Sequence, residues 1–157
     1  MDPTDEHTQR LSADLTVQPF DELVKRGLSF AREYALIQGH TVVRSVHLVV
    51  GLVSQRSELT MAALNECELN PDRLCLALLR MIRPERLAEV EISNTTWSTT
   101  AKRILERAVG LAQGDAQVSV EERHLWRSIL METRGVVFQA LDELGMIEAI
   151  ASRLEGI

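Results

Sequence analysis

The apolar residues in the first half of the chain recur with the period of an amphipathic helix. From Phe20 to Leu36 they follow one another at steps of three, four or five, which places them along one helical face. Gly39 comes after this stripe, and glycine is a common residue just past a helix C-terminus. The pattern predicts a helix that ends near Gly39. The residues of the apolar face are Phe20, Leu23, Val24, Leu28, Ala31, Ala35 and Leu36.

Three shorter helices are expected between Gly39 and Pro84. Ser45 is placed to cap the first of them, and Ser57 is placed to start the next. Asn70-Pro71 has the composition of an N-cap followed by the first helical residue, so it marks the last helix. Residues 84–96 carry β-branched and turn residues without a helical stripe, which predicts an extended linker.

The second half of the chain repeats the first in one constant register, which carries the dipeptide His47-Leu48 onto His124-Leu125. This alignment is called the repeat register, and the pairs around the dipeptide agree with it without a gap. These further pairs are Lys25-Arg26 with Lys102-Arg103, Leu28 with Leu105, Ala31 with Ala108, Ala35 with Ala112, Ala63-Leu64 with Ala140-Leu141, and Glu66 with Glu143. Because four helices could not bury such an apolar face alone, the two copies should pack together.

The predicted fold class is therefore all-α, with two pseudo-symmetric four-helix repeats forming one compact eight-helix domain. The repeats are assigned to residues 18–83 and 97–157, and residues 84–96 join them. Residues 1–17 lack helical periodicity and are interpreted as a flexible N-terminal arm. The side chains expected in the shared core are Leu48, Leu52, Leu64, Leu125, Ile129 and Leu141.

Composition narrows the function classes. The 157 residues are 45% hydrophobic and 25% charged, as in a globular protein, and the net charge of −6 argues against nucleic acid as the partner. No apolar run approaches the ~18 residues of a membrane span, and the acidic N-terminus resembles neither a signal nor a transit peptide. We expect a cytoplasmic protein without a membrane partner, in which Cys67 and Cys75 are reduced and buried.

A search for catalytic chemistry finds no candidate. No glycine is followed by lysine, so a phosphate-binding loop is excluded, and no zinc-binding motif occurs. His47 and His124 open corresponding helices and are interpreted as structural residues that bond to the neighbouring loop. Trp97 and Trp126 are interpreted as packed side chains. Lys102, Arg103, Glu106 and Arg107 are expected to form a solvated helix face. No catalytic, cofactor-binding or metal-binding residue is predicted.

The duplicated pattern resembles a known family. A helix with alanines four apart, a short loop, His-Leu at the start of a second helix, and then Ala-Leu before a turn is similar to the repeat of Clp N-terminal domains. The resemblance covers residues 20–82 and 97–157. It implies one compact domain of eight helices that docks adaptors or substrates at a ring-shaped unfoldase, or that occurs as a small free-standing protein.

The chain departs from this family immediately before each repeated histidine. Many members carry an acidic residue there, and in ClpC-type proteins the two acids help to bind phosphorylated arginine by pairing with its guanidinium. Val46 and Arg123 occupy these positions here. We therefore expect no selective phosphoarginine binding, and recognition of a protein partner through a different surface. The candidate partner-binding residues are Arg44, Val46, Glu121, Glu122, Arg123 and Trp126.

The sequence thus predicts a non-enzymatic protein-binding module of a Clp-type unfoldase or protease system, monomeric in isolation. Two alternatives remain open. One is a free-standing Clp-repeat regulator of such a machine. The other is a small helical ligand sensor or enzyme that shares the architecture.

Overall fold

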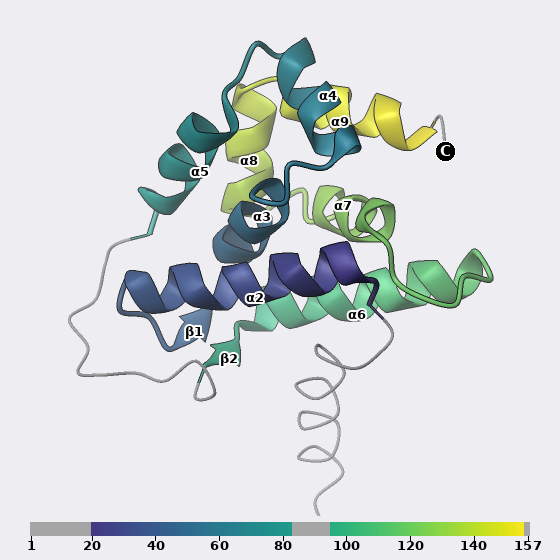
Figure 1. The fold of residues 1–157 in the computed structure, drawn as a ribbon, viewed down its shortest axis with the longest axis horizontal. Coiled ribbons are helices and arrows are strands. Elements are labelled where there is room, and N and C mark those ends of the chain that lie inside the picture. Colours follow the sequence, from purple (N-terminus) through teal and green to yellow (C-terminus); the bar gives the residue numbers. More distant parts are fainter. Residues whose placement is uncertain (1–19, 83–94, 156–157) are drawn as a thin grey trace, which may run out of the picture.

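The computed structural model of the chain describes residues 20–82 and 95–155. In these ranges the chain forms eight helices and two strands of two residues each, so the all-α prediction is confirmed (Figure 1). The predicted arm lies outside the described residues, as does all of the predicted linker except its last two residues. The helices are α2 (Glu22–Ile37), α3 (Ser45–Val53), α4 (Glu58–Glu66), α5 (Pro71–Leu79), α6 (Thr99–Gly114), α7 (Glu122–Leu130), α8 (Val136–Glu143) and α9 (Met146–Glu155).

The repeat register found in the sequence also relates the helices. It carries both ends of α2 onto α6 and both ends of α3 onto α7, and it places the start of α4 one residue before that of α8. The caps agree as well. Asp21 accepts the backbone N–H of Val24 before α2, and Ser98 accepts that of Ala101 before α6. The division at residues 18–83, 84–96 and 97–157 itself stays a prediction.

Two short bridges join the repeats reciprocally. Strand β1 (Val42–Val43) pairs in parallel with β2 (Thr96–Trp97), so that Val43 faces Trp97. An isolated parallel bridge joins Phe20 to Val120. In the repeat register, Phe20 corresponds to Trp97 and Val43 to Val120, so each bridge is the pseudo-symmetric image of the other. Such reciprocal contacts are those of a two-fold interface.

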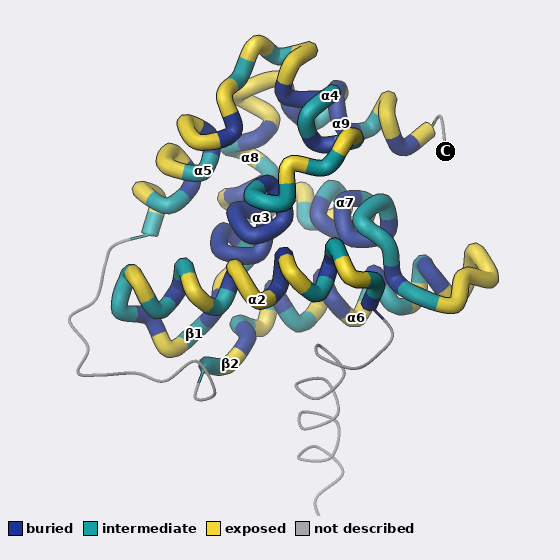
Figure 2. Tube along the Cα trace, viewed as in Figure 1, coloured by how far each residue is buried: buried dark blue, intermediate teal, exposed yellow. Residues whose placement is uncertain are grey.

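The core is centred on α3 and α7, which lie between the long helices α2 and α6 and the four remaining short helices (Figures 1 and 2). All six side chains predicted for the core are buried. Both tryptophans also pack inside, as expected. No helix among the described residues has the length and apolar character needed to cross a bilayer.

The start of α3 corrects one sequence expectation. Ser57 and Asn70 cap α4 and α5 as predicted. Ser45, however, is the first helical residue of α3, and Arg44 holds the N-cap position. The side chain of His47 takes over the capping role, because its Nδ1 accepts the backbone N–H of Arg44 at 3.0 Å.

The two cysteines also differ from expectation, since both thiols are free but only half-buried.

In repeat 1, α2 crosses α3 at two glycines. A Cβ atom added to Gly51 would lie 2.1 Å from the backbone oxygen of Gly27, which is far inside van der Waals contact. The crossing therefore brings the two backbones together with no room for a side chain at Gly51. The corresponding residues in repeat 2 are Ile104 and Ser128, and there the Ser128 hydroxyl donates to the backbone oxygen of Ile104 at 2.6 Å.

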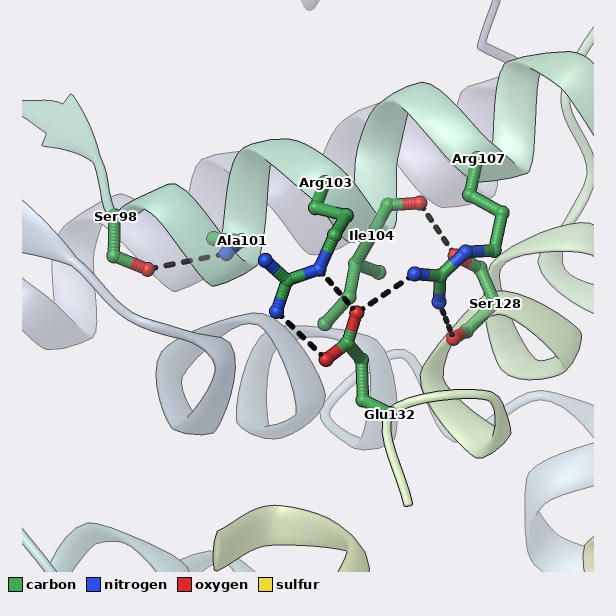
Figure 3. Close-up of polar contacts among 7 residues, drawn as sticks. All are labelled: Ser98, Ala101, Arg103, Ile104, Arg107, Ser128 and Glu132. Carbon is green, nitrogen blue, oxygen red and sulfur yellow. Dashed lines mark hydrogen bonds and ion pairs between the residues drawn. The ribbon is translucent and has the colours of Figure 1, made fainter. Parts of the chain in front are cut away.

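Repeat 2 adds an ionic clamp beside this crossing (Figure 3). Arg103 donates to both carboxylate oxygens of Glu132, at 2.7 and 2.9 Å, and Arg107 donates to one of them at 2.8 Å. Arg107 also donates to the backbone oxygen of Ser128. The two arginines hold the pKa of Glu132 down at about 2. Arg103 is exposed, as predicted for a solvated helix face, whereas Arg107 is half-buried, and both tie α6 to the end of α7.

Candidate functional site

The two repeated histidines make the same hydrogen bonds at the start of α3 and α7. The Nδ1 of each accepts the N–H of its N-cap residue, from Arg44 for His47 and from Glu121 for His124, at 3.0 Å in both cases. Their Nε2 atoms face corresponding side chains, Gln38 at 2.8 Å and Asp115 at 3.1 Å. Both imidazoles are fully buried. They hold the helix starts in place, which agrees with the structural role predicted from the sequence.

Each histidine-bearing helix start opens into a surface hollow. One, of about 490 Å³, is called the Glu121 hollow, and the other, of about 410 Å³, is called the Arg44 hollow. Six lining positions of one correspond to six of the other in the repeat register. The Glu121 hollow has Asp21, Leu23, Leu59, Glu121, Glu122 and Arg123 where the Arg44 hollow has Ser98, Thr100, Val136, Arg44, Ser45 and Val46.

The Glu121 hollow is acidic. Its lining also includes Glu58 and Arg153, which gives four carboxylates against two guanidinium groups. Both guanidinium groups are already ion-paired. Arg123 lies 3.2 Å from Asp115 and 3.5 Å from Glu121, and Arg153 lies 3.6 Å from Glu66. The field inside this hollow is therefore negative.

Glu122 anchors the Glu121 hollow to the other repeat. Its carboxylate accepts hydrogen bonds from the hydroxyls of Ser57 and Thr60 in repeat 1, and Thr60 in turn accepts the indole N–H of Trp126. Burial raises the pKa of Glu122, and these hydrogen bonds oppose the rise. The carboxylate is thus held by the fold and is not free to swing toward a ligand.

The Arg44 hollow has the opposite character. Arg44 is exposed at its rim and, among the described residues, is the only Asp, Glu, Lys or Arg in its lining. Val46 forms part of the wall with only 2% of its surface exposed. Burial first, and then the neighbouring His40 and Arg44, lower the pKa of His47 to about 4. That imidazole is therefore neutral near pH 7, and Arg44 carries the full charge at this helix start.

The structure distributes the six predicted partner-binding residues over both hollows. Arg44 and Val46 line one, and Glu121, Glu122 and Arg123 line the other. Trp126 lies in the core with 0% exposure and reaches neither surface. The lining contributed by the other repeat, such as Asp21 and Ser98, was missed because the sequence shows which positions correspond but not which of them meet.

The two hollows are suited to contact a partner's side chains. Among residues 20–82 and 95–155, no group of three or more His, Cys, Asp or Glu side chains is placed to hold a metal ion. The two repeated histidines, His47 and His124, have both ring nitrogens engaged. What remains is a pair of hollows with apolar walls and charged rims, the usual setting for side-chain recognition.

Comparison with known proteins gives one family and a set of similar folds. The sequence profile of the Clp repeat (R) N-terminal domain matches residues 19–144. The chain is 25% identical over 128 residues to the Bacillus subtilis protein described as "negative regulator of genetic competence ClpC/MecB". That alignment covers 81% of this chain and 15% of the relative, so the chain spans about one seventh of the relative's length.

Solved structures agree on the fold. The N-terminal domain of the chaperone ClpD from Arabidopsis thaliana has a TM-score of 0.67 and 20% identity, covering 87% of this chain and 94% of that one. The N-domain of ClpV from Vibrio cholerae has a TM-score of 0.68 and 15% identity, covering 91% and 89%. At such identities the likeness concerns the fold alone.

Proposed function

Because the chain belongs to the Clp repeat N-terminal domain family, we propose that it is a non-enzymatic docking module that binds an adaptor or substrate protein of a Clp-type unfoldase or protease system. The observation that carries this proposal is the pair of hollows at the two histidine-bearing helix starts. They present apolar walls and charged rims at the surface, and the chain supplies no phosphate-binding loop for ATP chemistry of its own. Residues 18–83 and 97–157 act together as one binding unit.

A capture experiment tests the docking role. The full chain is immobilised and incubated with lysate from the source organism, and the retained proteins are identified by mass spectrometry. We expect a Clp-type ATPase, an adaptor or a substrate to be retained and to be displaced by excess free chain. Equal retention by an unrelated helical protein of the same net charge would refute the proposal.

Selective phosphoarginine binding is not part of the proposed function. A carboxylate before each histidine would pair with the guanidinium of the ligand, and Val46 and Arg123 stand there instead. Losing a charge-assisted pair costs roughly 1.5–3 kcal/mol, or about ten- to a hundred-fold in affinity. Calorimetry with phosphoarginine and phosphoserine checks this. Micromolar binding of phosphoarginine alone would mean that another carboxylate, such as Glu121 or Glu122, has replaced the missing one.

A free-standing regulator of a Clp machine is the second candidate. The chain matches only a small part of a much longer relative, and a small protein with the same repeats would bind the same class of partner. Sequencing the gene beyond the codon for Ile157 separates the two. An ATPase module in the same reading frame favours the docking domain of an unfoldase, and a stop codon favours the regulator.

A further inference from the structure

We propose that the Arg44 hollow binds a short protein segment in which an acidic residue is flanked by aliphatic residues. This inference rests on the proposed docking function and specifies the chemistry of one of its two hollows. It differs from the expectation drawn from the sequence, which assigned partner recognition to a different surface. Four features of the hollow lead to it.

The first feature is a positive charge that no described carboxylate neutralises. Arg44 is exposed, and within the described part of the chain its guanidinium has no carboxylate partner. The arginines of the Glu121 hollow, in contrast, are each paired with a carboxylate. On a chain with a net charge of −6, an arginine at the rim of a hollow that has no described carboxylate partner attracts an acidic side chain.

The second feature is the apolar wall. Met81 and Val136 border the hollow with 43% and 59% of their surface exposed, and the almost fully buried Val46 also lines it. Exposed aliphatic side chains around a concave surface gain free energy when a partner covers them. An aliphatic residue next to the acidic one would cover them. A bare anion would not.

The third feature is the meeting of two helix starts. Ser45 and Val46 begin α3, Thr99 begins α6, and the lining of the hollow contains residues from both starts. The first backbone N–H groups of a helix lack intrahelical acceptors and carry partial positive charge. Together with Arg44 they make the field in the hollow positive, whereas a lysine or arginine side chain would be repelled.

The fourth feature is the opposite charge of the corresponding hollow in the same molecule. The Glu121 hollow also lies at two helix starts, and an acidic residue replaces the neutral or basic one at three of its six corresponding positions. The Glu121 hollow has Asp21 where the Arg44 hollow has Ser98, Glu121 where it has Arg44, and Glu122 where it has Ser45. The same architecture should therefore reject the acidic segment on one side of the molecule and accept it on the other.

The test is an NMR titration of the full, ¹⁵N-labelled chain with two capped peptides, Gly-Ser-Leu-Asp-Leu-Ser-Gly and its Leu-Asn-Leu counterpart. The first peptide should shift the amide signals of residues 44–46 and 98–100 in a saturable way. The second should bind at least about five-fold more weakly, because its central residue has lost the charge. Raising the salt concentration should weaken the first peptide only.

Variants of the chain locate the interaction. Arg44→Glu, which introduces the residue found at the corresponding position of the other hollow, should weaken the acidic peptide at least about ten-fold. Arg26→Glu is the matched control, since Arg26 is an exposed arginine of α2 that lines neither hollow, and it should leave binding unchanged. An unchanged amide spectrum away from residue 44 verifies that Arg44→Glu is folded.

Three outcomes would overturn the inference. Equal binding of the two peptides would remove the role of charge, and shifts centred on residues 121–123 would place the site in the wrong hollow. Equal shifts from inorganic phosphate alone would show a small-anion site without recognition of a protein segment. In all three cases partner capture by the full chain would still stand as a separate result, so failure here is distinguishable from failure of the docking function.

Discussion

The first two helices of each repeat are held together by different contacts in the two repeats. In repeat 1 the first two helices touch backbone to backbone, because Gly51 leaves no side chain between α3 and α2 at Gly27. In repeat 2 the corresponding helices, α6 and α7, carry Ile104 and Ser128 at these two positions. They are held by the Ser128 hydroxyl and by the clamp on Glu132.

The difference teaches how a duplicated fold can keep its geometry while its interactions diverge. The ends of α2 and α3 agree with those of α6 and α7 in the repeat register, as do the caps of α2 and α6 and the histidine bonds. The forces at the crossing do not, since close contact of backbones stabilises one copy and charge-assisted hydrogen bonds stabilise the other. Each predicted effect below is specific to one repeat.

The largest effect is expected at the glycine crossing. Gly51→Ala should lower the free energy of unfolding by about 3 kcal/mol or more, because the new methyl group would overlap the backbone oxygen of Gly27 and force the helices apart. Gly27→Ala is the matched control, since its Cβ would lie 3.5 Å from its nearest neighbours, in ordinary contact. It should change stability by less than about 1 kcal/mol. Urea denaturation of both variants measures the difference, and equal losses would contradict the asymmetry.

A pH-dependent effect is expected from His47. Its pKa is about 4 in the folded chain and about 6.5 in the unfolded chain. Between these two pH values His47 is protonated in the unfolded chain and largely neutral in the folded chain. The stabilisation that His47 provides is present above pH 6.5 and is lost as the pH falls towards 4.

Over that interval His47 should contribute a loss of about 2–3 kcal/mol. Comparing urea midpoints of wild type and His47→Gln at pH 7, 6 and 5 isolates this share from the titration of other groups. Wild type should lose more stability than the variant. Parallel curves would show that His47 is protonated equally in both states.

The clamp in repeat 2 should produce a smaller effect. Glu132→Gln, which introduces the residue that Gln55 provides at the corresponding position of repeat 1, should cost about 1–2 kcal/mol near pH 7 by weakening both arginine bonds. Because the folded pKa of Glu132 is about 2, the stabilisation is present above about pH 4.5 and is lost as the pH falls towards 2. Thermal melts at pH 7 and pH 3 measure it. A larger cost at pH 3 than at pH 7 would contradict the clamp.

The smallest effects are expected where the helices end. Gly39 has φ +79° after α2, whereas the corresponding residue after α6 is Ala116 at φ +56°. Ala116→Gly should therefore stabilise the chain and Gly39→Ala should destabilise it, each by about 1 kcal/mol or about 2–4 °C in melting temperature. Calorimetric melts of the two single variants suffice, and the same sign for both would rule out the left-handed backbone as the cause.

The sequence predicted the parts of the fold that depend on local pattern. The apolar stripe from Phe20, the caps at Ser57 and Asn70, and the repeat register are properties of neighbouring residues or of simple comparison. The cap at Ser45 was predicted wrongly because a histidine three residues into a helix is not a usual capping partner. Only the folded structure shows that His47 Nδ1 accepts a hydrogen bond from the backbone N–H of Arg44.

The clamp and the hollows could not have been predicted in this way. Arg103 and Glu132 are 29 residues apart, and nothing in either local pattern indicates that they meet. The Arg44 hollow combines the start of α3, the end of repeat 1 and the start of α6. Its residues were recognised singly, as Arg44 and Val46, but the wall at Met81 and Val136 requires the tertiary structure.

The reciprocal bridges carry a consequence for the origin of the chain. Phe20 pairs with Val120 and Val43 with Trp97, so one repeat supplies the first member of one bridge and the second member of the other. Two identical copies of an ancestral repeat would contain every residue needed to close both bridges as a homodimer. Fusion of the two genes would then have required only a connecting segment. After fusion, either copy could lose residues that the symmetric dimer needed twice, and the divergence of the two hollows is the kind of change that this freedom permits.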